Sequence, residues 1–299
     1  MTEQRDSLPR DILKKVRRIE IRTTRMVNEV FSGEYHSVFK GLGMEFSEVR
    51  EYQPGDDIRN IDWNVTARFG HPYLKIYKEE RELVVMLVVD LSGSQRFGTG
   101  ERFKTEAAAE ITAILSLAAI KNNDKVGLLV YTDRIEKFIP PKKGRSHVLR
   151  LIREILYFKP EGRGTNTSRA LEHLLGVIKK KCVVFVISDF IDSDYEKPLA
   201  IAARKHDLIA LKLSDQLEMT FPKAGLIRMY DLESGAERLV DSSNAKFRKL
   251  FQTRIGLSRQ RFDKTMTRLG IDTVYIPAGG DYSKPLIRFF ESRAKRIRR

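Results

Sequence analysis

The chain has 299 residues, 41% of them hydrophobic, and carries 55 Lys and Arg against 40 Asp and Glu, so its formal net charge is +15. The length fits one large domain or a domain with a smaller one, and the hydrophobic content is enough for a real core. The basic excess favours acidic partners, namely nucleic acid, an anionic membrane surface or an acidic protein face. A soluble protein with a basic surface and no polyanion site is the alternative.

The cysteine content and the apolar runs bear on the compartment. Cys182 is the only cysteine, which excludes an internal disulfide and fits a reducing compartment. Residues 1–10 are polar and contain no apolar signal core. The longest helix-like apolar stretch, residues 113–120, is far short of the ~20 residues that a spanning helix needs. We expect a soluble cytoplasmic protein, with peripheral attachment to the inner membrane through partners as the alternative.

Residues 1–33 contain one amphipathic basic helix. Apolar residues recur at roughly helical spacing between Asp11 and Val30, and Lys and Arg fill the other positions. We expect the apolar stripe to pack on the main domain and the basic face to be solvated. Binding of this face to a membrane surface or an acidic partner is the alternative.

Residues 34–80 have a different character and predict a small β-rich subdomain. A strand is expected around residues 46–52, a turn at Pro54–Gly55, and a half-exposed strand at residues 73–77. Either Asp56 or Asp57 is expected to cap a short helical turn.

The turn in this subdomain is rich in charge, with Asp57, Arg59 and Asp62 close to Trp63. We expect a salt-bridged, capped turn that packs on Trp63. A partner-binding surface formed by the same four residues is the alternative.

From residue 81 to residue 293 the chain alternates strand and helix patterns. Residues 83–89 form an unbroken Val-rich run, which is typical of a strand buried on both faces of a parallel sheet. The alternation predicts an α/β fold, with a mostly parallel, doubly wound sheet and helices on both faces. The expected helices cover residues 102–122, 147–158, 168–179, 195–205, 247–269 and 285–293. The other expected strands cover residues 125–132, 135–138, 182–187, 208–213, 226–230, 238–240 and 271–276. A basic, frayed tail is expected from residue 294 to residue 299.

Oxygen-bearing side chains stand at the ends of two of these strands and in a loop between them. Asp90, Ser92 and Ser94 follow the first strand, Thr165 lies in a Gly-Thr-Asn loop before a helix, and Asp189 follows the strand at residues 182–187. Ligand sites in such sheets lie beyond the carboxyl ends of the strands, and oxygen ligands suit a hard cation. Each residue alone would also fit a helix cap or a turn, and Thr167 is an alternative to Thr165.

This five-residue pattern resembles the metal-ion-dependent adhesion site of von Willebrand factor A-type domains. The resemblance implies a bound Mg²⁺ or Mn²⁺, with the hydroxyls as ligands and with Asp90 and Asp189 acting largely through water. The ion would keep an open position for an acidic side chain of another protein. Phe190 and Ile191, beside Asp189, are expected to add apolar contact on the same face.

A second resemblance covers about residue 39 to the C-terminus. The block at residues 48–63, followed by Thr66-Ala67-Arg68, is similar to the signature of the bacterial domain-of-unknown-function family 58, in which it precedes an A-type domain. The pieces Gly225-Leu226-Ile227 and Asp281-Tyr282-x-x-Pro285-Leu286 fit as well. The resemblance implies a MoxR-type AAA+ ATPase as partner and an adaptor role in assembly or maturation of a protein complex.

The sequence thus predicts a non-catalytic, metal-dependent protein-binding module. The five His residues are scattered, none forms a ligand-spaced pair, and the chain has no phosphate-binding P-loop pattern. One alternative is binding of nucleic acid or an anionic membrane through the basic helices at residues 11–30 and 244–269. A Mg²⁺-dependent hydrolase is a minor alternative.

Overall fold

The computed structural model describes residues 10–28, 35, 38–39, 44–79, 82–96, 104–215, 223–233 and 235–297. The expectations for residues 1–9 and 298–299, and for the basic side chains between residues 10 and 15, fall outside this part of the chain.

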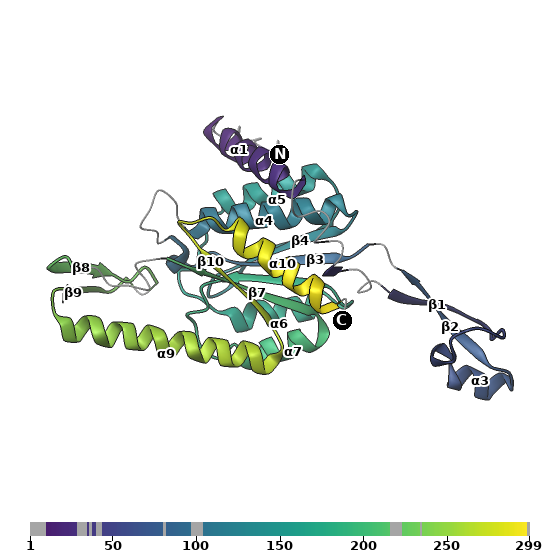
Figure 1. The fold of residues 1–299 in the computed structure, drawn as a ribbon. Helices are drawn as coiled ribbons and strands as arrows, with labels where there is room; N and C mark the ends of the chain where they lie inside the picture. The colour runs from purple at the N-terminus through teal and green to yellow at the C-terminus, as the bar shows by residue number, and fades with distance from the viewer. Residues whose placement is uncertain are drawn as a thin grey trace.

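A six-stranded sheet forms the centre of the molecule, in the order β10-β7-β6-β3-β4-β5 (Figure 1). Neighbouring strands are parallel except for β5, which pairs with β4 as an antiparallel hairpin. The predicted mostly parallel sheet is therefore confirmed. The strands are β3 (Val84–Asp90), β4 (Lys125–Tyr131), β5 (Ile135–Lys142), β6 (Val183–Ser188), β7 (Asp207–Ser214) and β10 (Asp272–Pro277).

The strands are buried because alternate side chains enter two different cores. In β3, Val85, Leu87 and Val89 face one core, whereas Met86 and Val88 face the other, and all five are fully buried. Full burial of one such side chain is worth about 1.5–3 kcal/mol, so a strand of this composition is stable only between two layers of helices.

Helices cover both faces of the sheet, as predicted for a doubly wound fold (Figure 1). The first core contains residues of α1, α4, α5 and α10, and the second contains residues of α6, α7 and α9. The helices of the first face are α1 (Arg10–Met26), α4 (Lys104–Lys121), α5 (Arg145–Tyr157) and α10 (Ser283–Ile297). Those of the second face are α6 (Thr167–Val177), α7 (Glu196–Lys205) and α9 (Ala245–Leu269).

Helix α4 is apolar around most of its circumference because it is enclosed. It contacts the strands β3 and β4 below and the helices α1 and α5 above. Every residue from Ala107 to Ala119 is buried. The basic helix α1 rests on it with Val16, Ile19 and Val27 buried and Arg17 and Arg18 exposed. This is the packed arrangement that the sequence favours for α1.

Two domain boundaries differ from the sequence prediction. Tyr35, Val38 and Phe39 belong to the first core and not to a subdomain that begins at residue 34. Phe39 is in contact with Phe185 of β6 and Phe290 of α10, with ring centroids 6.3 and 6.1 Å apart. At the other end, α10 continues to Ile297 with Ala294 buried, where the sequence predicts a frayed tail.

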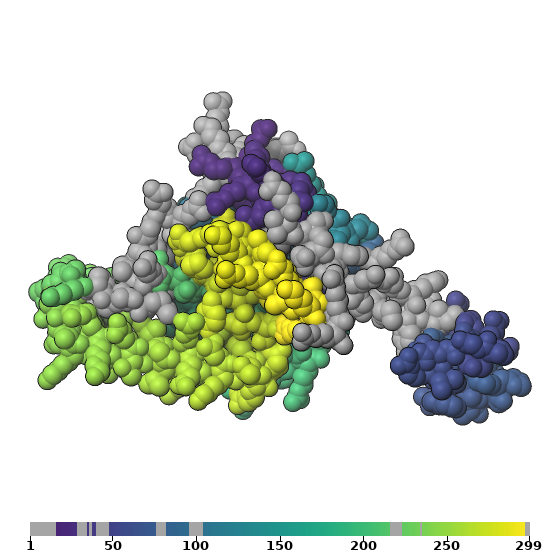
Figure 2. Space-filling view, in the orientation of Figure 1, coloured from purple at the N-terminus to yellow at the C-terminus, as the bar shows by residue number. Residues whose placement is uncertain are grey.

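Two small hairpins lie outside the sheet. The first, called the arm here, consists of β1 (Met44–Glu51), the short 3₁₀ helix η2 (Ile58–Asn60), α3 (Trp63–Phe69) and β2 (Tyr73–Glu79). Figures 1 and 2 show the arm projecting from one end of the molecule. The second is the hairpin of β8 (Leu226–Tyr230) and β9 (Glu237–Asp241), which lies at the opposite end. Within the described residues, no helix has both the length and the apolar character required to span a membrane.

Candidate metal centre

The site begins where β3 ends, at Asp90. Its carboxylate is fully buried and is held on both sides: Oδ1 accepts a hydrogen bond of 2.9 Å from the Ser92 amide, and Oδ2 accepts one of 2.7 Å from the Ser188 hydroxyl. Ser188 closes β6, the strand beside β3. The neighbouring strand ends therefore fix the orientation of Asp90.

The hydroxyls of Ser92 and Ser94 lie next to each other, 3.0 Å apart. Ser92 is fully buried and Ser94 is half-buried. Between them, the Gly93 amide donates a 2.8 Å hydrogen bond to the carbonyl of Arg163. This bond ties the segment after β3 to the loop that carries Thr165.

Asp189 forms a buried ion pair. Its Oδ2 is 3.0 Å from Nζ of Lys104, at the first turn of α4, and the Lys104 side chain is fully buried. Oδ1 of Asp189 is also buried and has no hydrogen-bond partner within the described residues. Lys212 of β7 donates a hydrogen bond to the Asp189 backbone carbonyl. One carboxylate oxygen thus remains for a ligand.

Glu233, at the tip of the β8–β9 hairpin, completes the cluster. The Thr165 hydroxyl donates a 2.9 Å hydrogen bond to Oε1 of Glu233, and Ser94 also hydrogen-bonds to this carboxylate. The distant hairpin therefore brings an acidic group to two of the predicted metal ligands.

Burial and the charge of Asp189 raise the pKa of two acidic groups at the site. Burial raises the pKa of Asp90 to about 7, the charge of Asp189 adds to the rise, and hydrogen bonds from Ser92 and Ser188 oppose it. Burial, followed by the charges of Asp189 and Asp231, raises the pKa of Glu233, while hydrogen bonds from Thr165 and Ser94 lower it. A cation at this position would relieve the repulsion between the carboxylates.

The donor set fits a divalent cation that binds through hydroxyls. Within the described residues, no three His, Cys, Asp or Glu side chains gather in a way that could hold a metal ion. The oxygens at the site are instead the adjacent Ser hydroxyls, the Thr165 hydroxyl and the unpartnered Oδ1 of Asp189. All are hard oxygen ligands, of the kind that Mg²⁺ and Mn²⁺ accept.

A cavity of about 320 Å³ opens beside Asp189. Ile191 and Leu213 provide apolar wall, and Lys212 and Arg259 provide positive charge. It lies between the ends of β6, β7 and β10 and the helix α9, because its other lining residues are Ser214, Ile255, Ser258, Tyr275 and Pro277. A molecule bound at the metal site could extend a side chain into this space.

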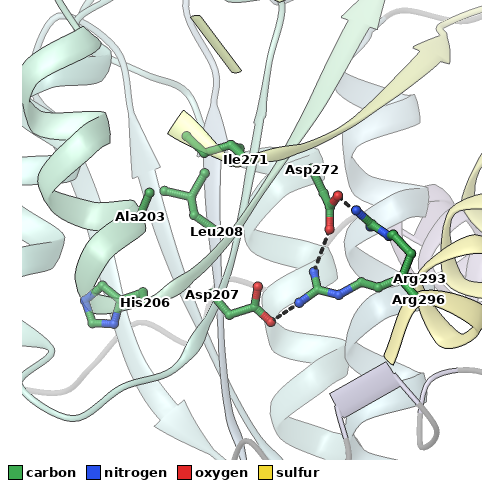
Figure 3. Close-up of a pocket in the computed structure, with 9 residues that line it drawn as sticks. Ala203, His206, Asp207, Leu208, Ile271, Asp272, Arg293 and Arg296 are labelled. Carbon is green, nitrogen blue, oxygen red and sulfur yellow. Dashed lines mark hydrogen bonds and ion pairs between the residues drawn. The ribbon is translucent and has the colours of Figure 1, made fainter. Parts of the chain in front are cut away.

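A second cavity lies at the opposite, N-terminal edge of β7 and β10 and is closed by ion pairs (Figure 3). Arg293 of α10 pairs with Asp207 and Asp272, and Arg296 lies 2.7 Å from Asp272. These two arginines and two aspartates neutralise each other. The ion pairs attach α10 to the sheet, and the four side chains leave no unpaired charge for a ligand in the cavity.

Comparison with known proteins identifies the family. Residues 48–261 match the family described as "Protein of unknown function DUF58". The chain belongs to the DUF58 family. Uncharacterized protein Rv1480 of Mycobacterium tuberculosis is 28% identical over 283 residues, covering 94% of this chain and 89% of that protein. YeaD of Bacillus subtilis is 26% identical over 109 residues, covering 36% of this chain and 25% of that protein.

Solved structures with similar architecture include BatB from Bacteroides thetaiotaomicron and a von Willebrand factor type A protein from Catenulispora acidiphila. The first has a TM-score of 0.47 at 15% identity and covers 71% of this chain and 99% of its own. The second has a TM-score of 0.36 at 13% identity and covers 72% of this chain and 42% of its own.

In this DUF58 protein the five predicted metal-site residues come together at the carboxyl edge of the sheet. Thr165, and not Thr167, faces the site: Thr167 is fully buried and bonds to Asp192, with its amide 2.7 Å and its hydroxyl 3.0 Å from that carboxylate. Asn166 caps α6. The structure thus favours the first of the two threonines.

The prediction of two apolar contact residues is half wrong. Ile191 is 65% exposed beside the site, but Phe190 is only 3% exposed. The backbone of Phe190 has a positive φ of 51°, which turns the ring inward onto Tyr195 and Phe262. A residue that follows a site in sequence does not necessarily face the same way.

The family-signature residues of the arm lie away from the candidate metal site, because β2 leads into the opposite end of β3 (Figure 1). Asp57 caps η2 and pairs with Arg59 at 2.8 Å, and Asp62 caps α3. The predicted capped turn is therefore present. The expectation that it packs on Trp63 is wrong, since Trp63 is 69% exposed.

Sequence reasoning missed Glu233 and Lys104. Nothing in the sequence indicates where the tip of an added hairpin will dock. Lys104 leaves a weak signal, because it lies in the first turn of a helix that is apolar on most sides, and a Lys that is buried there needs an acidic partner.

Proposed function

We propose that this protein is a non-catalytic binding module, in which a divalent cation, Mg²⁺ or Mn²⁺, accepts an acidic side chain from a partner protein. The observation that carries the proposal is the meeting of oxygen ligands from three distant segments, with Oδ1 of Asp189 buried and unpartnered. A buried carboxylate oxygen without a partner is costly unless a ligand satisfies it.

The residue types determine what the cation would do. Ser92, Ser94 and Thr165 would bind it without adding negative charge, and Asp90 and Asp189 would act largely through water. A Mg²⁺ or Mn²⁺ ion held in this way keeps net positive charge and attracts a carboxylate. The chain's own side chains orient the ion, and the exposed Ile191 and the adjacent cavity give the partner a surface to bind.

The partner we propose is a MoxR-type AAA+ ATPase, with this chain as an adaptor in assembly or maturation of a protein complex in the cytoplasm. The support for this choice is the resemblance of residues 48–63 to the signature of the DUF58 family, which implies such an ATPase as partner. The support for an acidic contact residue is the positive charge that a bound divalent cation would supply.

The test compares binding of the chain to the purified ATPase in Mg²⁺ and in chelator, by calorimetry. We expect the substitution pair Asp90→Ala and Ser92→Ala to weaken binding at least about 10-fold, which corresponds to about 1.4 kcal/mol. The matched control is Asp241→Ala with Ser243→Ala, because Asp241 accepts the same bond from an amide two residues later, at 2.9 Å, away from the site. Binding that is unchanged in chelator would contradict the proposal.

A second candidate function is attachment to an anionic surface through α9. The solvent face of α9 carries many basic residues, and Asp263 is the only acidic residue of the helix. The exposed basic residues are Lys246, Lys249, Arg254, Arg259, Arg261, Lys264 and Arg268. Affinity for anionic vesicles or nucleic acid that falls steeply with salt and ignores chelator would favour this function.

A Mg²⁺-dependent hydrolase is the remaining alternative, and Glu233 is the group that could serve as its base. Phosphatase turnover that disappears in Asp90→Asn would support it.

A further inference from the structure

The tip of the β8–β9 hairpin lies against the proposed metal site, with Glu233 next to Thr165 and Ser94. The hydroxyls of Thr165 and Ser94, both predicted metal ligands, form hydrogen bonds with the carboxylate of Glu233. The charge of the nearby Asp189 contributes to the raised pKa of Glu233. The chain thus presents to its own site the chemical group expected from a partner.

The contact between tip and site depends on Gly93. A Cβ atom on this residue would lie 2.4 Å from the backbone carbonyl oxygen of Leu232 and 3.2 Å from that of Arg163. Neither neighbour is a flexible side chain that could give way. Glycine at this position therefore leaves the space in which the hairpin tip is seated between the two serines of the site.

Asp231 accepts hydrogen bonds from two described residues of the tip. The Glu233 amide donates a 3.0 Å hydrogen bond to Oδ1 of Asp231, and the Gly235 amide donates one of 2.8 Å to the Asp231 carbonyl. Gly235 has a φ of +75°, which glycine adopts without strain. The turn therefore fixes the direction in which Glu233 points.

The strands of the hairpin, by contrast, bury little. Leu226 is 66% exposed, Tyr230 55% and Leu239 64%. Lifting the tip from the site would therefore cost mainly the polar contacts of Glu233 and the packing of Leu232, and little apolar burial. An element attached in this way can exchange between a seated and a released position.

We propose that Glu233 is an internal acidic ligand of the metal site, which the acid of a partner must displace. The inference rests on the proposed function and adds its regulation. Because the hairpin is tethered, its effective concentration at the site is high, and a partner's apparent affinity is reduced by the fraction of molecules in which the tip is seated.

The first test uses Mn²⁺ alone, with calorimetry and hydrogen exchange on the full chain. In the wild type we expect Mn²⁺ to bind and to slow exchange of the amides at the hairpin tip. Glu233→Gln keeps the shape but loses the charge, so it should still bind Mn²⁺, several-fold more weakly, and should lose the protection of the tip. Gly93→Ala should lose the protection with Glu233 intact. Glu237→Gln on β9, an exposed residue, is the matched control and should behave like the wild type.

The second test uses a short poly-glutamate peptide and measures only the part of binding that chelator removes. We expect Glu233→Gln to bind the peptide about 10-fold more tightly than the wild type does, because the internal competitor is lost.

The outcomes separate the two proposals. If the wild type does not bind Mn²⁺, or if Ser92→Ala leaves Mn²⁺ binding unchanged, the proposed function is wrong and the internal ligand falls with it. If Mn²⁺ binds and needs Ser92, but Glu233→Gln keeps the tip protected and does not gain peptide affinity, the internal ligand alone is overturned.

Discussion

At the scale of single residues, the buried ion pair of Lys104 and Asp189 bears most directly on the proposed metal site. The ammonium neutralises Asp189 at 3.0 Å in a place that water does not reach. In the proposed function, a divalent cation would compete with Lys104 for the same carboxylate. The pair leaves Asp189 with a partner when no metal is bound, and we expect it to lower the affinity of the proposed site for a cation.

Replacing Lys104 should make the fold depend on metal. Lys104→Met leaves Asp189 buried without its cation, so we expect the free energy of unfolding in chelator to fall by about 3–5 kcal/mol. Saturating Mg²⁺ should restore much of this loss, because the ion takes the place of the ammonium. Urea unfolding followed by circular dichroism, with and without Mg²⁺, measures both effects.

The control for this experiment is Lys137→Met. Lys137 pairs with Glu154 at 2.6 Å, but its side chain is 34% exposed. Its loss should cost no more than about 1 kcal/mol and should not respond to Mg²⁺. Equal stability of Lys104→Met in Mg²⁺ and in chelator would show that no cation binds next to Asp189.

His206 should make the fold sensitive to acid. Burial, followed by the charge of Lys205, lowers the pKa of His206 to about 4 from an ordinary value of 6.5. In the unfolded chain, His206 therefore binds a proton below about pH 6.5. In the folded chain, it binds a proton only below about pH 4. The stabilising contribution is complete above pH 6.5 and is lost as the pH falls toward 4.

The expected loss of stability between these pH values is about 1–3 kcal/mol. Urea midpoints measured from pH 7 to pH 4 should show it in the wild type, and His206→Gln should flatten this part of the curve. His71→Gln, a substitution of an exposed His on the arm, should leave the slope as it is. A wild-type slope that survives in His206→Gln would mean that another group is responsible.

At the scale of elements, helix α10 depends on one arginine. Arg293 is 12% exposed and pairs with Asp207 of β7 and Asp272 of β10 (Figure 3). Its guanidinium also lies over the ring of Phe39, 5.3 Å from the ring centroid. It thus joins the last helix to the edge strand β10, to its neighbour β7 and to Phe39, which precedes the arm.

Arg293→Met should destabilise the protein by about 3–5 kcal/mol, because two partly buried carboxylates then lose their shared cation. The amides of α10 should exchange faster than those of α4. Arg296→Met removes a residue that is 61% exposed and pairs with the same Asp272, so it should cost at most about 1 kcal/mol. Equal effects of the two substitutions would rule out the special role of Arg293.

The helices and strands also show which parts of the fold and of the candidate site can be predicted from the sequence. Residues 83–89 require a strand buried on both faces because all their side chains are apolar, and this run placed the centre of the sheet correctly. The parallel arrangement then brought Asp90 and Asp189 to one edge. The docking of Glu233 could not be predicted in this way, because it depends on how the tip of an exposed hairpin meets Gly93 and not on any local pattern.

At the scale of the whole molecule, the same limit explains the misplaced boundary before the arm. Tyr35 and Phe39 precede a β-rich segment, and their own pattern does not reveal that they return to the main core. Their burial is decided by Phe185 and Phe290, which lie far along the chain. The prediction that Phe190 contacts a partner was wrong for a local reason, because a positive φ directs its ring inward.

The exposure of Trp63 has an optical consequence. It is the only tryptophan of the chain, and it lies on the arm with 69% of its surface exposed. Its fluorescence therefore reports the surroundings of the arm tip and should change little when the central sheet unfolds. A soluble quencher should reach it in the native protein. We expect a ligand that binds at the arm to change this emission, and Mg²⁺ at the proposed metal site to leave it unaltered.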